Sequence, residues 1–397
     1  MAWRVLISKI PKSKTLTPKF PSLVSNPKPN LSIFSTPFST SFLITKTPKK
    51  IQEKMLQTRL PTHQTRLGGA DPNPHLESIL QRDSYFRFLT PSKSFLSTQP
   101  EHTLRLDDAG KLYRELGFPG GRKVSRFLQR HPTIFATYRH TDNKMWVGFT
   151  EFMEELLLEE KEIMNEMESD RVNKVRKLLM MTKYKRILLS KIHHCRLLFA
   201  VPDDFRDRVA KYPEFFRIVM EDDGKRILEL VKWDPLLAVS AIEREFLVDE
   251  DRVKKMFKFP VKYGKDLGLE DEMKKLNSLN TLPMVSLYSD GWRFDLWSLE
   301  AEKYRVGVVH EFLRLTLEKR ASIHHIVEFK EEFSLTRQTY QMLKKQPQTF
   351  YLAGTEMNWD VFLKDAYDGD GVLIVKDPQV VFNDKLRTYA QMHEGEL

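Results

Sequence analysis

The sequence predicts a mainly α-helical fold with small β-hairpins, an α+β class in which three related units follow one another. Three stretches share the order helix, short strand, helix, helix and two-strand hairpin. In each, a proline follows the last helix and a phenylalanine comes three residues later, in RHPTIF (130–135), KYPEFF (211–216) and KQPQTF (345–350). The uneven spacing of these prolines indicates degenerate repetition with an insertion. Because this order is that of a winged helix, we expect three degenerate winged-helix-like units in tandem.

The first unit is expected over about 75–150. Its elements are predicted, in order, as a helix at 76–88, a strand at 103–106, a helix starting at Asp107 and Asp108, a helix carrying Val124, Phe127 and Leu128, and strands at 134–138 and 145–149. The carboxylates suit a helix start, where they accept backbone N–H bonds. The last helix must end before Pro132, since the residue before a proline is disfavoured in the α region.

The second unit is expected at about 171–233 and the third at about 305–366, with a less regular insertion at 234–304. In the second unit, Asp223 and Gly224 separate two apolar runs and are a strong hairpin-turn signal. In the third, the strands at 350–352 and 359–363 form the corresponding hairpin. In all three joints the proline is expected to stop the helix and the phenylalanine to anchor the first hairpin strand in the core.

Residues 1–52 contain nine Lys and Arg, no acid and many Ser and Thr, a composition typical of an organelle transit peptide. The alternative is a disordered basic tail that touches RNA itself. Lysine outnumbers arginine, so the composition leaves mitochondrion and chloroplast open. A linker is expected at 53–74 and a short tail at 391–397, on either side of a domain spanning 75–390.

Composition and charge narrow the possible classes of protein. The formal net charge is +10, but the nine unopposed cations of 1–52 leave the rest of the chain near +1. A polyanion site would therefore require local clustering. The single cysteine, Cys195, excludes an intrachain disulfide, and no apolar run is long enough to span a membrane.

A block of opposite charges lies in the middle of the chain. Residues 151–170 hold nine acids and one lysine, and 171–200 hold nine cations and no acid. One interpretation is a long helix whose acidic half lies against the basic face of the first unit. The other is an ordinary solvated, charged helix.

Two groups of basic residues are candidates for binding nucleic-acid phosphates. The first comprises Arg122, Lys123, Arg126 and Arg130, expected on one face of the last helix of the first unit, with Arg139 and Lys144 in its hairpin. The second comprises Arg171, Lys174, Arg176, Lys177, Lys183, Lys185, Arg186, Lys191 and Arg196. Tyr138, Trp146 and Tyr184 are candidates for stacking on unpaired bases. The alternatives are solvated charged faces and core aromatics.

Other chemistry is not indicated. The pairs His193-His194, followed by Cys195, and His324-His325 could suggest metal ligands, but adjacent helical residues point about 100° apart, so we expect structural or surface histidines and no metal. No Gly-rich phosphate loop or nucleophile motif is present. The sequence therefore predicts neither an enzyme, nor a cofactor, nor a small-molecule substrate.

Several stretches resemble the plant organelle RNA recognition (PORR) family. They are RKVSRFLQRHPTIF (122–135), VRKLLMM (175–181), LFAVPDDFRDRVAKYPEFF (198–216), ELVKWDP (229–235) and VGVVHEFL (306–313). The resemblance covers about 75–390. It implies a plant protein imported into an organelle that binds RNA, and it implies a part in splicing group II introns. It implies no particular contact residues.

The resemblance and the charge pattern lead to two main hypotheses. The first is a non-catalytic RNA-binding protein that promotes splicing of organellar group II introns, with mitochondria as the expected organelle, chloroplasts as the alternative, and other splicing factors as partners. The second is a protein-interaction scaffold in a splicing complex, with little RNA affinity. Duplex DNA binding and an enzymatic activity are further alternatives.

Overall fold

The computed structural model describes residues 73–247, 282, 285–289, 293–346, 349–355 and 358–392. The chain divides into two compact units, Met1–Gln64 and Thr65–Leu397, and the fold below is that of the second. The predicted transit peptide, most of the predicted linker, much of the insertion at 234–304 and the end of the tail lie outside the described residues.

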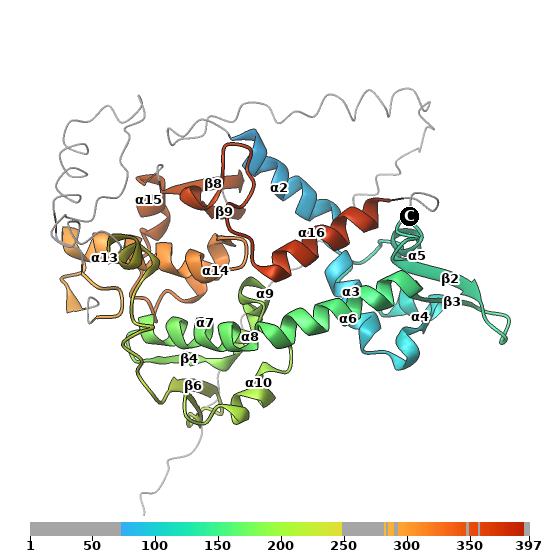
Figure 1. Ribbon diagram of the computed structural model, residues 1–397, viewed down its shortest axis with the longest axis horizontal. Coiled ribbons are helices and arrows are strands. Elements are labelled where there is room, and N and C mark those ends of the chain that lie inside the picture. Colours follow the sequence, from blue (N-terminus) through green and yellow to red (C-terminus); the bar gives the residue numbers. More distant parts are fainter. Residues whose placement is uncertain are drawn as a thin grey trace, which may run out of the picture. The chain divides into compact units, whose positions relative to one another are not determined.

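Three groups of elements repeat one order along the chain (Figure 1). The first contains α3 (Leu89–Ser97), β1 (Leu104–Arg105), α4 (Leu106–Lys111), α5 (Val124–Leu128), β2 (Phe135–Arg139) and β3 (Met145–Phe149). The second contains α7 (Glu168–Met181), β4 (Arg186–Leu188), α8 (Leu189–His194), α9 (Arg196–Phe199), α10 (Phe205–Arg208), β5 (Phe216–Met220) and β6 (Arg226–Leu230). The third contains α13 (Leu299–Leu315), β7 (Arg320–Ser322), α14 (Ile323–Glu328), α15 (Thr339–Lys344), β8 (Phe350–Thr355) and β9 (Asn358–Leu363).

Additional elements lie between the units, at their ends or, for η1 and η2, within them. They are α2 (Pro74–Tyr85), α6 (Glu151–Glu166), α11 (Ala241–Leu247), α16 (Pro378–Gln391) and the short 3-10 helices η1 (Pro100–His102), η2 (Val209–Lys211) and η5 (Lys364–Ala366). Each unit has a three-stranded antiparallel sheet, with orders β1-β3-β2, β4-β6-β5 and β7-β9-β8. The short strand thus pairs with the second hairpin strand every time. The predicted α+β class is confirmed, while the winged-helix assignment stays a prediction.

The joint between the last helix and the hairpin has the same geometry in all three units. Phe135, Phe216 and Phe350 begin β2, β5 and β8 and are 2%, 3% and 1% exposed. The backbone N–H of each donates to the carbonyl four residues earlier, at 2.9, 3.0 and 2.9 Å. The predicted anchoring phenylalanines are therefore confirmed. Pro347 lies outside the described residues.

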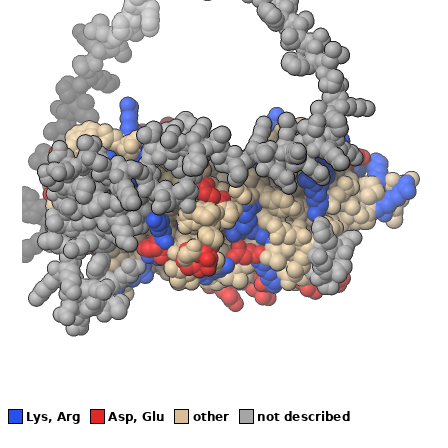
Figure 2. Space-filling view, turned by 90° about the horizontal axis from the view of Figure 1, so that it is seen from above, with Lys and Arg blue, Asp and Glu red and all other residues tan. Residues whose placement is uncertain are grey.

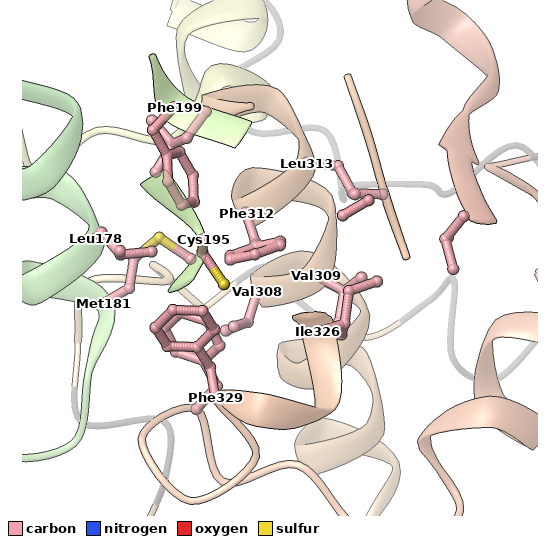
Figure 3. Close-up of a cluster of buried hydrophobic side chains, with 14 of the residues drawn as sticks. Leu178, Met181, Cys195, Phe199, Val308, Val309, Phe312, Leu313, Ile326 and Phe329 are labelled. Atoms are coloured by element: carbon pink, nitrogen blue, oxygen red, sulfur yellow. The ribbon is translucent and has the colours of Figure 1, made fainter. Parts of the chain in front are cut away.

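The hydrophobic core of the second unit is continuous with that of the third. Figure 3 shows Leu178 and Met181 of α7 facing Val308 and Phe312 of α13. All four side chains are at most 2% exposed. Burial of this kind contributes about 25 cal/mol per Å² of apolar surface, so the two units are expected to unfold together.

The acidic and basic blocks do not form one continuous helix. α6 ends at Glu166, and Met167, with φ −89° and ψ 5°, separates it from α7. Two acids of α6 form ion pairs with lysines of other helices. Glu160 pairs with Lys93 of α3 at 2.5 Å, and Glu159 pairs with Lys385 of α16 at 2.5 Å. Helix α6 therefore contacts the first unit, as one interpretation expected, through Glu160 and Lys93. It also contacts α16, which was not expected, through Glu159 and Lys385.

Helix α16 was not expected from the hydrophobic pattern, yet it completes the first unit. Its Phe382, Leu386 and Ala390 belong to the same buried cluster as Val124 and Leu128 of α5. The helix packs along α6. Its start carries a signal that the sequence analysis overlooked, because Asp377 precedes Pro378 and accepts a hydrogen bond from the Gln379 N–H at 3.0 Å.

Helix α2 packs against β8 of the third sheet, and α16 contacts the residue that precedes β7. Glu318, just before β7, contacts Arg320 of that strand, Arg82 of α2 at 3.7 Å and Arg387 of α16 at 3.3 Å. Burial alone would raise the pKa of Glu318, but the three guanidinium groups lower it to about 2. One carboxylate therefore ties together three elements that are distant in sequence.

We expect the stability of the chain to fall on acidification through the range from about pH 4.5 to about pH 2. The folded pKa of Glu318 is lowered from 4.5 to about 2, so its contribution is present above the unfolded pKa and is lost as pH falls through the folded one. Unfolding free energies measured against pH should show this slope in the wild type. The slope should be smaller in Glu318→Gln, and an unchanged slope in that variant would contradict the assignment.

Candidate nucleic-acid interface

Four of the nine predicted basic residues of 171–200 lie on α7 and form internal ion pairs. Arg171, 3% exposed, donates to both carboxylate oxygens of Asp377 at 2.8 and 3.0 Å. Lys174 bridges Asp377 at 2.9 Å and Asp170 at 2.8 Å. Burial would raise the pKa of Asp377, but these two cations hold it far below its ordinary value. Both basic side chains therefore bind the residue that caps the start of α16.

Arg176 and Lys177 are similarly enclosed. Arg176, 5% exposed, pairs with Asp234 at 3.0 Å and lies over the ring of Phe215 at 4.0 Å. Lys177, 6% exposed, pairs with Glu311 of α13 at 2.7 Å. A phosphate could approach Lys177 only by displacing the buried carboxylate of Glu311, and Arg176 only by displacing the carboxylate of Asp234. We therefore do not retain the four cations of α7 in the candidate interface.

Two further cations of the block also have acidic partners. Lys191 pairs with Glu332 at 2.6 Å, where both side chains are less than one fifth exposed. Arg196 pairs with Asp203 and donates to the His193 carbonyl at 3.0 Å. Although 171–200 has no internal acid, acids outside it pair with seven of its nine cations, since Arg186 also lies 3.9 Å from Glu221. Apart from Asp203, these partners lie too far along the chain to be read from the local sequence.

Lys185 closes the end of α7. Its backbone has φ 56°, in the left-handed region, and its ammonium donates to the Met180 carbonyl at 2.7 Å. Lys319 repeats this geometry after α13, with φ 51° and a bond to the Arg314 carbonyl at 2.8 Å. The carbonyls that lack partners at a helix end are thus satisfied by a lysine five residues later.

We expect Lys185→Glu to lower the free energy of unfolding by roughly 1.5–3 kcal/mol, the usual worth of a hydrogen bond from a charged donor. Arg186→Glu changes the charge by the same amount and should have a smaller effect, since the Arg186 side chain is 44% exposed. Chemical denaturation of both variants checks this. Equal stabilities would show that the capping bond contributes nothing.

The remaining residues of this block lie together at the surface of the second unit. Tyr184 is 62% exposed, and its ring lies 4.8 Å from the Lys183 ammonium and 5.5 Å from the Arg186 guanidinium carbon. Arg186 and Arg217 flank Glu229 in one cross-strand row, and Arg217 pairs with Glu229 at 2.7 Å. We call Lys183, Tyr184, Arg186 and Arg217 the second-unit face.

The first unit presents a stronger cluster of cations. Arg122, Lys123, Arg126, Arg130, Arg139 and Lys144 are all exposed. Within the described part of the chain, none of these six is in an ion pair with a carboxylate. We call them the first-unit basic surface. In Figure 2, Lys and Arg side chains stand out at the right-hand end, where the β2–β3 hairpin lies, whereas blue and red alternate over the middle.

The expected helical face of arginines is only partly present in this surface. Because α5 covers Val124–Leu128 alone, Arg126 is helical, while Arg122 precedes the helix and Arg130 follows it. The cations therefore surround the short helix instead of forming one row along it. Arg122 is held by the ring of Phe88, at 5.4 Å.

Two of the predicted stacking residues are neighbours on the outer side of the first sheet. Tyr138 and Trp146 are directly opposite each other in the β2–β3 pairing, and Arg105 lies opposite Trp146 on the other side. Tyr138 is 39% exposed. The His140 ring lies 4.9 Å from the Trp146 ring. An aromatic row beside exposed cations is suited to an unpaired strand, whose bases stack while its phosphates are neutralised.

The basic surface and the aromatic row lie on a mainly helical α+β fold. Among the described residues, no helix is long and apolar enough to cross a bilayer. Comparison with known families identifies the class more closely. A model described as "Plant organelle RNA recognition domain" matches residues 72–395. The chain belongs to the plant organelle RNA recognition family.

The chain is also similar to several curated proteins. It is 34% identical to "Protein WHAT'S THIS FACTOR 1 homolog, chloroplastic" of Oryza sativa, over 78% of this chain and 63% of the relative. It is 30% identical to "Protein ROOT PRIMORDIUM DEFECTIVE 1" of Arabidopsis thaliana, over 89% of this chain and 86% of that relative. It is 25% identical to "Protein WHAT'S THIS FACTOR 9, mitochondrial" of Arabidopsis thaliana, over 74% of this chain and 78% of that relative.

The chain spans less than two thirds of the length of the WHAT'S THIS FACTOR 1 relatives. No solved structure matches the chain. The description of the family names plant organelles, so the expected organellar location is confirmed, although the particular organelle is not.

Proposed function

We propose that this protein binds single-stranded regions of organellar RNA and promotes the splicing of group II introns without catalysing the reaction itself. Its first-unit basic surface holds phosphates of the intron, and the aromatic row of Tyr138 and Trp146 receives unpaired bases. The RNA is thereby biased towards its reactive fold, and the intron performs the chemistry. Family membership and the resemblance noted in the sequence support this role.

One structural observation carries the proposal: within the described residues, six exposed cations of the first unit form no ion pair with a carboxylate. In the second unit, by contrast, most basic residues are neutralised internally. Exposed, unpaired cations interact with phosphates without first breaking an ion pair. The interface is therefore assigned mainly to the first unit, with the second-unit face as an extension.

The test is filter binding of residues 53–397 to a group II intron RNA at increasing salt, since the nine cations of 1–52 would otherwise contribute. Contacts to about six phosphates of a single strand predict a slope of log K against log salt near −4. Duplex DNA serves as competitor. A slope near zero would reject RNA binding and favour the second candidate, a protein-interaction scaffold recruited by other splicing factors. The near-neutral charge outside 1–52 favours that candidate.

We further propose a chloroplast location in place of the mitochondrial one expected from the sequence. The three relatives at 33% to 34% identity are all named chloroplastic, and the one named mitochondrial is 25% identical. A fluorescent protein fused after residues 1–60 should enter plastids. Accumulation in mitochondria would restore the first expectation.

A further inference from the structure

The structure brings together three metal-ligating side chains that the sequence separates. His194, at the end of α8, adjoins Cys195, and His325 lies on α14 in the third unit. One potential ligand atom from each lies within 4.8 Å of the others. The sequence argument against a metal considered adjacent histidines, whereas the folded chain uses one histidine from each pair.

A fourth potential ligand lies among them. Glu328 of α14 accepts a hydrogen bond at Oε2 from His194 Nδ1 at 2.6 Å, and the Cys195 thiol donates to the same oxygen at 3.7 Å. The His194 and His325 rings have centroids 5.3 Å apart. Two imidazoles and one thiol therefore converge between equivalent helices of two units, and one carboxylate contacts His194 and Cys195.

The state of His325 independently points to a ligand. Its Nδ1 is buried and has no hydrogen-bond partner among the described residues. A buried imidazole nitrogen without a partner is costly unless something binds it.

We infer that His194, Cys195, His325 and Glu328 bind one Zn²⁺ ion. Zinc is bound by four such nitrogen, sulfur and oxygen ligands in a tetrahedron, with bonds of about 2.0–2.3 Å. The set mixes soft and hard donors, which suits zinc better than magnesium or calcium. To reach those bond lengths, the ligand atoms of His194, Cys195 and His325 must move closer together, whereas His194 Nδ1 and Glu328 Oε2, now 2.6 Å apart, must separate. The 64% exposed His194 side chain has the freedom to move.

Binding has a defined proton balance and a structural consequence. The ion displaces the proton of the Cys195 thiol, which leaves to solvent. His194 binds through Nδ1 as a neutral ring with its hydrogen on Nε2, so it adds no charge. The resulting thiolate and carboxylate balance the two charges of the ion. Since the ligands come from α8 and α14, the ion ties the second unit to the third and stabilises the folded chain by mass action.

The experiment uses the purified full chain, stripped with a chelator and titrated with Zn²⁺ and, as a spectroscopic probe, Co²⁺. We expect one equivalent of tightly bound ion, thiolate-to-cobalt charge-transfer absorption, and a melting temperature that rises with added Zn²⁺. Cys195→Ala should abolish the charge-transfer band, and His325→Gln should weaken binding at least about tenfold. His193→Gln, one residue away and exposed, is the matched control and should bind as the wild type does.

The outcomes are decisive in both directions. Absence of binding by the wild type, or equal binding by the wild type, Cys195→Ala and His325→Gln, would overturn the zinc site. Circular dichroism of each metal-free variant separates lost binding from lost folding. If Cys195→Ala does not fold, Glu328→Gln replaces it, and unchanged zinc affinity in that variant and in His325→Gln together would be equally contradictory.

Discussion

Lys177→Met is expected to lower the free energy of unfolding by about 3–5 kcal/mol, because it leaves a carboxylate buried without its counter-charge. Glu311 is 1% exposed. It accepts hydrogen bonds from Lys177 at 2.7 Å, from the Tyr288 hydroxyl at 2.9 Å and from the Ala241 N–H at 2.8 Å. Burial would raise its pKa, but Lys177 in particular keeps the pKa below its ordinary value. The carboxylate therefore stays charged in the fold.

Urea denaturation of Lys177→Met checks this expectation, and a double variant identifies the cause. Lys177→Met with Glu311→Leu removes both charges and should recover part of the loss, since a buried ion pair replaced by apolar groups is often neutral in its effect. The matched control is Lys161→Met, an exposed lysine on α6. A double variant no more stable than Lys177→Met would show that lost packing, not the unpaired charge, is responsible.

The same pair shows why the basic block was misjudged from the sequence. Its partners, Asp234, Glu311 and Asp377, lie between 58 and 206 residues away from the cations that they bind. Charge counted along the chain is local, whereas burial and pairing depend on the folded neighbours. Nothing in 171–200 distinguishes Lys177, which is buried, from Arg186, which is exposed.

Local sequence signals predicted the structure correctly where neighbouring residues alone determine the backbone geometry. The turn at Asp223-Gly224 and the anchoring Phe135 depend on residues within a few positions, and the structure has them as expected. The helix expected to start at Asp107 begins at Leu106, and no side chain caps it. Helix α16 and the meeting of Cys195 with His325 depend on long-range packing. The helix expected at 76–88 in the first unit was wrong in its place, because α2 packs against β8 of the third unit and α3 takes that position in the first. Nor did the sequence predict which surfaces remain open after the units have packed.

The first-unit basic surface provides the largest expected effect on function. Arg126→Ala, Arg130→Ala and Arg139→Ala together should reduce the salt slope of RNA binding by about 2, since each lost phosphate contact on a single strand removes about 0.7. Affinity at moderate salt should fall by roughly tenfold or more. All three side chains are exposed, so folding should be unaffected, and filter binding with circular dichroism tests both statements.

Two comparisons decide what this surface contributes. Lys183→Ala, Arg186→Ala and Arg217→Ala remove the same charge from the second-unit face and should reduce the slope by less, because Arg186 and Arg217 have acidic neighbours. Tyr138→Ala should weaken binding by about 1–3 kcal/mol, the cost of one lost stacking contact, and should leave the salt slope unchanged. Equal effects of the two triple variants would mean that RNA responds only to net charge, and the first unit would then have no special role.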